Sequence, residues 1–114
     1  MTVAQFRKMA LSFPEAVEAA HMGHPDFRVG GKIFATLGYP NEGFGVLLLS
    51  PEEQREIIGR HPKMFEPVPG GWGRRGSTQV VLARITRPFL DAAMKKAWQR
   101  KAPERLSKSR RVAR

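Results

Sequence analysis

Glycine and proline divide this chain into short segments, and their spacing limits the folds that the chain can adopt. The 114 residues include 11 Gly and 9 Pro. No apolar run is longer than that of residues 46–49. Connections of hairpin length, such as the Gly-, Pro- and Asn-containing stretch 38–43, join neighbouring segments. We therefore expect a mainly antiparallel sheet with helices packed on it.

Five segments have the composition of β-strands. They cover residues 17–22, 33–37, 44–49, 64–68 and 78–85. The Gly30-Gly31 turn precedes the second of them, and a glycine-rich stretch joins the last two. The sequence thus predicts a five-stranded sheet.

Three segments predict helices. Thr2 is an N-cap with Gln5 as its capping-box partner. Ser50-Pro51-Glu52-Glu53 is the clearest boundary signal, because it combines an N-cap, a proline at the first helical position and a capping-box glutamate. The third helix begins near residue 87, has one apolar face and ends at Pro103.

Together these elements give the order α-β-β-β-α-β-β-α, an α+β fold in a single domain. We expect the domain to cover residues 1–103. The following residues, 104–114, have the composition of a disordered basic tail.

The stretch Pro69-Gly70-Gly71-Trp72-Gly73-Arg74-Arg75-Gly76 is the strongest candidate for a contact surface. Glycine lets another surface approach the backbone, and arginine offers a planar fork that suits phosphate. We expect a protruding turn in which Arg74 and Arg75 contact phosphates. Trp72 either stacks on a base or packs in the core beside Phe65, and we favour the core for this residue.

A second glycine-basic turn carries Arg28 and Lys32 on either side of Gly30-Gly31. If both turns project on the same side, four cations face one ligand. The alternative is a tight hairpin whose glycines serve backbone geometry alone. These glycines do not form a phosphate-binding P-loop, because Asp26 replaces its first glycine and Ile33 replaces the Ser/Thr after the lysine.

Several sequence blocks, in the same order, resemble the MmcQ/YjbR family of small bacterial proteins. The blocks are Leu11-Ser12-Phe13-Pro14-Glu15-Ala16, His24-Pro25-Asp26-Phe27-Arg28-Val29-Gly30-Gly31-Lys32-Ile33-Phe34-Ala35, Leu49-Ser50-Pro51-Glu52-Glu53-Gln54, Gly71-Trp72-Gly73-Arg74-Arg75-Gly76, and Ala97-Trp98 followed by Ala102-Pro103. The resemblance covers roughly residues 4–103 and is carried by the set of blocks rather than by one of them.

The resemblance implies a compact α+β fold with a five-stranded antiparallel sheet, similar to the secretion-chaperone-like architecture. It also implies DNA binding through a "double wing" arrangement. The tail after Pro103 lies outside the family pattern, so the resemblance implies nothing about it.

Positive charge is concentrated at the C-terminus. Residues 1–99 carry 13 Lys and Arg against 9 Asp and Glu, a net of +4, and residues 100–114 carry 7 against 1, a net of +6, which sum to +10. We expect Lys108, Arg110 and Arg111 of the tail to add electrostatic affinity for a phosphate backbone. A tail that only improves solubility is the alternative.

Other classes of function have little support in the sequence. There is no Cys, so we expect no disulfide, thiol nucleophile or Cys-ligated metal. His21 and His24 converge only if the chain turns at Gly23, and we expect neither a metal site nor a cofactor. Glu52, Glu53 and Glu56 suit a solvated helix start rather than an acid/base pair. We expect no enzymatic activity.

No signal peptide or membrane-spanning run is visible, so we expect a cytoplasmic protein that does not bind membranes. The leading hypothesis is a non-enzymatic protein that binds nucleic acid, DNA in particular, with low specificity and as a monomer. The main alternative is a chaperone-like module that binds a protein partner. A small-molecule site near Trp72 and Tyr39 is a third possibility.

Overall fold

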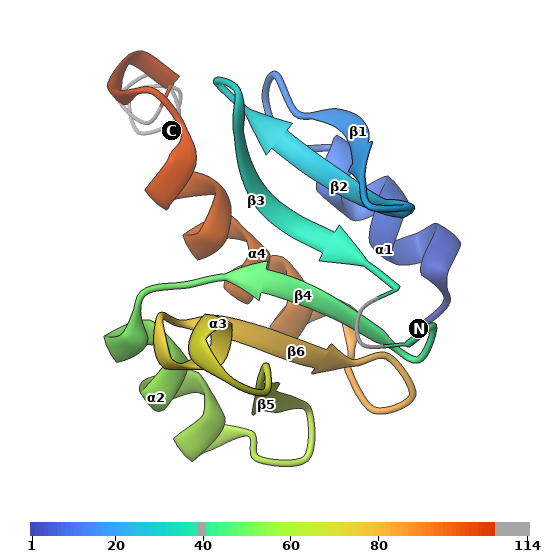
Figure 1. Cartoon of the computed structure of the whole chain (residues 1–114), viewed down its shortest axis with the longest axis vertical. Coiled ribbons are helices and arrows are strands. Elements are labelled where there is room, and N and C mark those ends of the chain that lie inside the picture. The colour runs from blue at the N-terminus through green and yellow to red at the C-terminus, as the bar shows by residue number, and fades with distance from the viewer. Residues whose placement is uncertain (39–40, 107–114) are drawn as a thin grey trace.

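The computed structural model describes residues 1–38 and 41–106 and has an α+β fold (Figure 1). Its helices are α1 (Val3–Leu11), α2 (Pro51–Arg60), α3 (Gly71–Arg74) and α4 (Arg87–Lys101). Its strands are β1 (Val17–His21), β2 (His24–Val29), β3 (Lys32–Leu37), β4 (Phe44–Leu48), β5 (Phe65–Pro67) and β6 (Ser77–Val81). None of the helices in these described residues is long and apolar enough to span a membrane.

The strands form one six-stranded sheet in the order β1-β2-β3-β4-β6-β5, and all neighbouring strands are antiparallel. The expected α+β class and antiparallel arrangement are confirmed, but the expected number of five strands is wrong. The additional strand is β2, which contains Pro25 near its start. A proline there removes one ladder hydrogen bond only at the end of the strand, so the rest of β2 can still pair.

The expected helix starts are confirmed. Thr2 and Gln5 form a capping box at α1, and Ser50 and Glu53 form one at α2. Each box satisfies two backbone N–H groups that a helix end would otherwise leave without partners.

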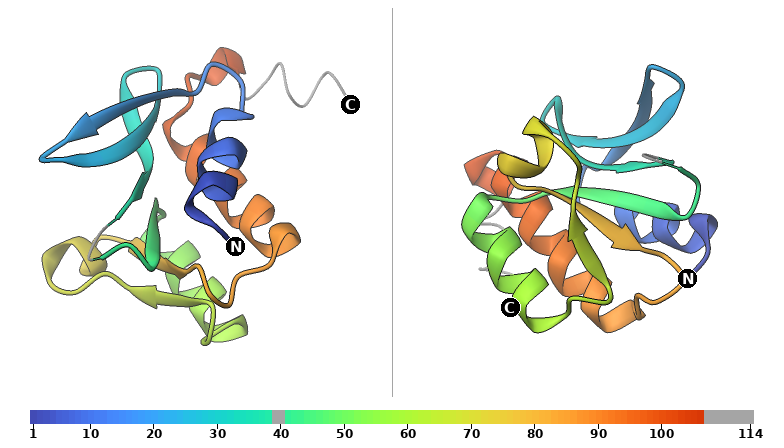
Figure 2. Two further views of the ribbon diagram at one scale, coloured as in Figure 1. Left: turned by 90° about the vertical axis from the view of Figure 1, so that its right-hand side faces the viewer. Right: turned by 60° about the horizontal axis from the view of Figure 1, so that its bottom comes forward.

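The helices lie mainly on one side of the sheet. Figure 2 shows α1 and α4 behind the sheet, whereas α3 and the tip of the β1–β2 hairpin project from the other side. Phe6 of α1 packs over Gly45 of β4, where an added Cβ would lie 2.5 Å from the ring. The core between these layers includes Phe27, Phe34, Leu47, Leu90, Met94 and Trp98.

The packed domain extends beyond its expected end at Pro103. Leu106 is buried and belongs to the core, and Arg105 donates two hydrogen bonds to Glu15 at 3.0 and 3.1 Å. Residues 104–106, assigned to the tail from their charge, therefore pack on the domain. The basic composition of residues 104–114 placed the end of the domain too early, because the burial of Leu106 holds residues 104–106 on the domain.

Candidate functional site

The glycine-rich stretch forms a short helix, α3, rather than the protruding turn expected from its sequence. Gly70 precedes it with a φ of 81°, a left-handed conformation that glycine adopts without strain. The amide of Gln54 on α2 donates hydrogen bonds to the carbonyls of Gly73 and Ser77, at 2.9 and 3.0 Å. A buried polar side chain therefore fixes α3 against α2.

Gly73 and Gly76 allow α3 to sit against the backbone of the domain. A Cβ on Gly73 would collide with the carbonyl of Val68, and one on Gly76 would collide with the carbonyl of Leu49. Gly76 also has a φ of 113°, which side chains rarely tolerate. These two glycines form the side of the segment that packs against the domain. The residues between them, Arg74 and Arg75, are exposed.

Trp72, Arg74 and Arg75 are the outward-facing residues of this segment. Trp72 is 62% exposed, so its expected position in the core beside Phe65 is wrong. The physical reason is that Gly73, and not Trp72, is the residue of α3 that packs against the backbone of the domain, at Val68. Both arginines are exposed, and neither forms an ion pair within the described residues.

The second glycine-basic turn separates its two cations. Val29 pairs with Lys32 across the turn, whereas Arg28 pairs with Ile33. Directly paired residues share a face and successive residues alternate, so Arg28 and Lys32 point to opposite faces of the hairpin. The four expected cations therefore do not converge on one ligand.

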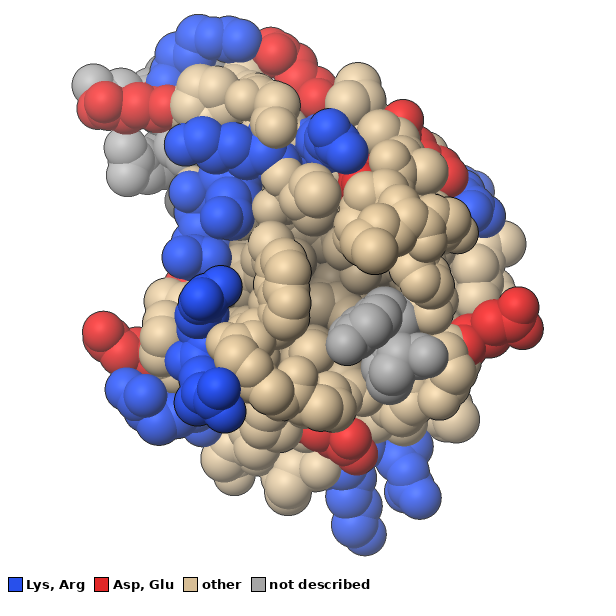
Figure 3. All heavy atoms as spheres, viewed as in Figure 1, with Lys and Arg blue, Asp and Glu red and all other residues tan. Residues whose placement is uncertain are grey.

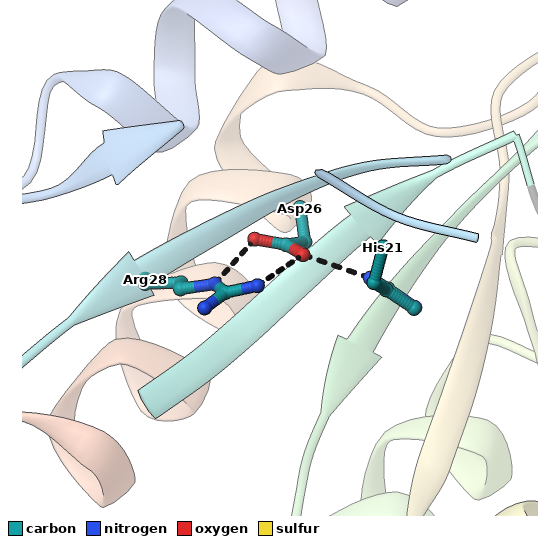
Figure 4. Close-up of polar contacts among 3 residues, drawn as sticks. All are labelled: His21, Asp26 and Arg28. Atoms are coloured by element: carbon teal, nitrogen blue, oxygen red, sulfur yellow. Dashed lines mark hydrogen bonds and ion pairs between the residues drawn. The ribbon is translucent and has the colours of Figure 1, made fainter. Parts of the chain in front are cut away.

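Arg28 is engaged in an ion-pair network on the face away from α1 and α4 (Figure 4). Its Nε and Nη2 donate to the two carboxylate oxygens of Asp26 at 2.8 and 3.0 Å. Nδ1 of His21 lies 2.8 Å from the same carboxylate. Asp26 is fully buried, and its hydrogen bond with Arg28 is the main cause of a pKa below the usual range.

This network includes His21, one of the two histidines that the sequence analysis considered for a metal site. The chain turns at Met22 and Gly23, both with positive φ, so His21 and His24 face each other across the hairpin. Among the described residues, no group of three or more His, Cys, Asp or Glu side chains could hold a metal ion.

Lys32 instead joins two cations at the end of α4. The β2–β3 turn packs against that end, because a Cβ on Gly30 would lie 3.0 Å from the Pro103 ring. Burial lowers the pKa of Lys101, and the neighbouring charges of Arg100 and Lys32 lower it further. Within residues 1–38 and 41–106, Lys32 and Lys101 form no ion pair with a carboxylate.

Arg100 connects this cluster to α3 through the start of α2. Its Nη1 donates to the carbonyl of Leu48 at 2.8 Å, and its Nε lies 3.9 Å from Glu53. Gln54, the next residue on α2, holds Gly73 of α3. Figure 3 shows the resulting band of Lys and Arg side chains along one edge of the molecule, over the end of α4, the β2–β3 turn and α3.

We call this surface the basic edge, and define it by the exposed or half-buried cations Lys32, Arg74, Arg75, Arg100 and Lys101. Lys32, Arg74 and Arg75 were expected from the sequence, whereas Arg100 and Lys101 were not. Basic residues in the last turn of a helix are a common feature that complements the helix dipole. Arg100 and Lys101 lie near Lys32 only because Pro103 packs on the β2–β3 turn. The predicted tail residues Lys108, Arg110 and Arg111 lie outside the described residues.

A shallow hollow lies beside α3, lined by Gln54, Pro67, Pro69, Gly70 and Arg74 among others. Its walls are mostly backbone and proline, and the amide of Gln54 is already directed at two carbonyls. Arg74 is the one charged side chain in this lining, so the hollow lacks the several converging polar groups of a small-molecule site. Tyr39, the other residue named for such a site, lies outside the described residues.

Comparisons with known proteins identify the family. The YjbR family model matches residues 11–100. The crystal structure of Deinococcus radiodurans protein DR2400, which carries a DUF419 domain, superposes with a TM-score of 0.70 at 18% sequence identity. The match covers 85% of this chain and 75% of that one, and at this identity it bears on the fold alone. A search of curated proteins finds no match.

Proposed function

This chain belongs to the YjbR family, and from that premise we propose that it is a non-enzymatic cytoplasmic protein that binds the phosphate backbone of DNA. One observation carries the proposal: cations from three separate parts of the chain gather on the basic edge. Lys32, Lys101 and both arginines of α3 have no carboxylate partner among the described residues. Unpaired cations in a continuous band are the usual footprint of a polyanion.

The residues of the basic edge have different roles in this proposal. Arg74 and Arg75 offer guanidinium forks that can bind a phosphate through two hydrogen bonds. Lys32 and Lys101 supply compact charges, and a bound phosphate would offset the repulsion that lowers the pKa of Lys101. Arg28 has no part in the interface, because Asp26 occupies its guanidinium. Lys108, Arg110 and Arg111 of the tail add affinity without selectivity.

Non-enzymatic action is supported by three hydroxyl groups whose hydrogen bonds are structural. Ser12 and Thr78 donate to backbone carbonyls, and Ser50 accepts from a backbone N–H as a helix cap. The His21–Asp26 pair has Arg28 as its third member rather than a nucleophile. This arrangement suits structure better than acyl or phosphoryl transfer.

The test is a salt titration of DNA binding by fluorescence anisotropy, with the double variant Arg74→Ala/Arg75→Ala. If four to six phosphates are contacted, affinity of the full chain falls about 10²- to 10³-fold between 50 and 200 mM salt. Loss of two contacts lowers the slope of log affinity against log salt by about 2. The matched control is Lys8→Ala/Arg84→Ala, which removes two exposed cations away from the basic edge and should leave that slope nearly unchanged.

A second arm separates the basic edge from the tail. The triple variant Lys108→Gln/Arg110→Gln/Arg111→Gln keeps the packed segment through Leu106 intact. If this variant still binds DNA in preference to heparin, the basic edge carries recognition. If binding disappears, or heparin competes equally, the binding is tail electrostatics and the protein-interaction alternative takes its place.

A further inference from the structure

We infer that the basic edge is built for single-stranded DNA, with one base stacked on the exposed indole of Trp72 while the phosphates follow the cations. This inference rests on the proposed function and specifies its ligand.

Trp72 carries the first part of the argument. Its side chain is 62% exposed, although the chain has a well-packed core in which the other tryptophan, Trp98, is fully buried. It makes no ring contact within the described residues, and its chain neighbours Gly71 and Gly73 have no side chains to cover it. An exposed indole fixed on an anchored helix is a platform for a flat aromatic group.

The positive charges beside Trp72 indicate which kind of aromatic ligand would bind it. Arg74 and Arg75 follow within three residues, and both are exposed without carboxylate partners in the described part of the chain. A nucleotide combines a flat base with a phosphate group, and so could contact Trp72 and one of these arginines at the same time. Single-strand binding surfaces commonly pair a stacking aromatic residue with a positively charged track for the backbone.

The shape of the basic edge favours one strand over two. On the face that Figure 3 shows, the Lys and Arg side chains of the basic edge form a band along one side. α3 has only four residues, so it is too short to act as a recognition helix in the major groove. In a duplex the bases are already stacked on each other, and Trp72 would have to unstack them before it could bind one. A single strand presents its base faces freely.

The two tryptophans make the test direct. Trp98 is buried, and its indole nitrogen donates a hydrogen bond to the carbonyl of Pro14, so a ligand at the basic edge cannot reach it. Because Tyr39 also fluoresces, tryptophan is excited selectively, and a change of tryptophan fluorescence on binding then reports Trp72. We expect a 15-residue oligothymidylate to quench this fluorescence and to bind more tightly than the matched duplex at equal salt.

Two substitutions at Trp72 distinguish stacking from mere proximity. Trp72→Leu keeps an apolar side chain but lacks a stacking face, so affinity for the oligothymidylate should fall about 5- to 100-fold. Trp72→Phe should retain most of the affinity. Met22→Asn is the control, because Met22 is 93% exposed but lies on the β1–β2 turn, and asparagine suits its positive φ of 50°. It should leave affinity unchanged.

The outcomes separate this inference from the proposed function. If the duplex binds as tightly as the single strand, or if Trp72→Leu has the same affinity as Trp72→Phe, the single-strand inference is overturned. In that case a loss of binding in Arg74→Ala/Arg75→Ala would still support DNA binding along the basic edge. If no DNA binds and the arginine variant changes nothing, the proposed function itself fails.

Discussion

The two segments that combine glycine with basic residues, the β2–β3 turn and α3, differ in the arrangement of their charges. At the β1–β3 side of the sheet, Arg28 is held by the buried carboxylate of Asp26, which His21 also contacts. On α3, Arg74 and Arg75 are exposed and have no carboxylate within ion-pair distance in the described residues. An arginine next to glycine is thus a candidate for ligand binding only where it forms no ion pair with a buried carboxylate.

The largest expected effect comes from a change that removes no charge. Gly76→Ala would place a Cβ against the carbonyl of Leu49 at a positive φ, so we expect a loss of about 3–4 kcal/mol in the free energy of unfolding. Gly71→Ala is the control, because its Cβ would meet only the Arg74 side chain at 3.7 Å. Urea denaturation measures both. Equal stability of the two variants would show that close packing does not hold α3.

Removal of the buried carboxylate should destabilise the hairpin without affecting the basic edge. In Asp26→Ala, Arg28 and His21 lose their shared partner, and we expect a loss of about 2–3 kcal/mol. DNA affinity of the folded protein should stay the same. Denaturation and anisotropy on one sample test both statements, and a marked drop in affinity would place Arg28 back in the interface.

A low pH should weaken the ion pairs of Asp26 with Arg28 and His21, whereas α3 contains no acidic group that could be protonated. The folded-state pKa of Asp26 lies below its usual value, mainly because of the hydrogen bond from Arg28. Its stabilising contribution is therefore complete above the unfolded pKa near 4 and is lost as pH falls through the lower folded pKa. Stability measured between pH 7 and pH 2.5 should fall less steeply in Asp26→Asn than in the wild type. Identical slopes would contradict this account.

The smallest expected effect concerns Lys101. Its pKa is lowered from the usual value for lysine by burial and by the charges of Arg100 and Lys32, so it loses its charge at a lower pH than this usual value implies. As the pH rises, the affinity for DNA should therefore begin to decline at a lower pH in the wild type than in Lys101→Arg.

A second variant tests the same residue by salt dependence: Lys101→Gln should lower the slope of log affinity against log salt by about 1. If Lys101→Gln keeps the wild-type slope, Lys101 lies outside the interface.

Local signals predicted much of the fold. The capping boxes at Thr2 and Ser50, the apolar face of α4 and the hairpin-length connections were sufficient for the α+β class and an antiparallel sheet. β2 was missed because His24-Pro25 at its start is typical of a turn, although the polar and apolar residues of the segment alternate. This alternation is what a strand with one covered face requires.

The sequence by itself determined which segments become helices or strands and where positive charge accumulates, since capping, periodicity and composition act over a few residues. Only the tertiary structure decided which cations meet. Arg28 and Lys32 are four residues apart yet face opposite ways, while Lys32 and Lys101 are far apart in the chain and repel each other. Strand register and the packing of Pro103 on the β2–β3 turn are long-range contacts, and no local pattern encodes them.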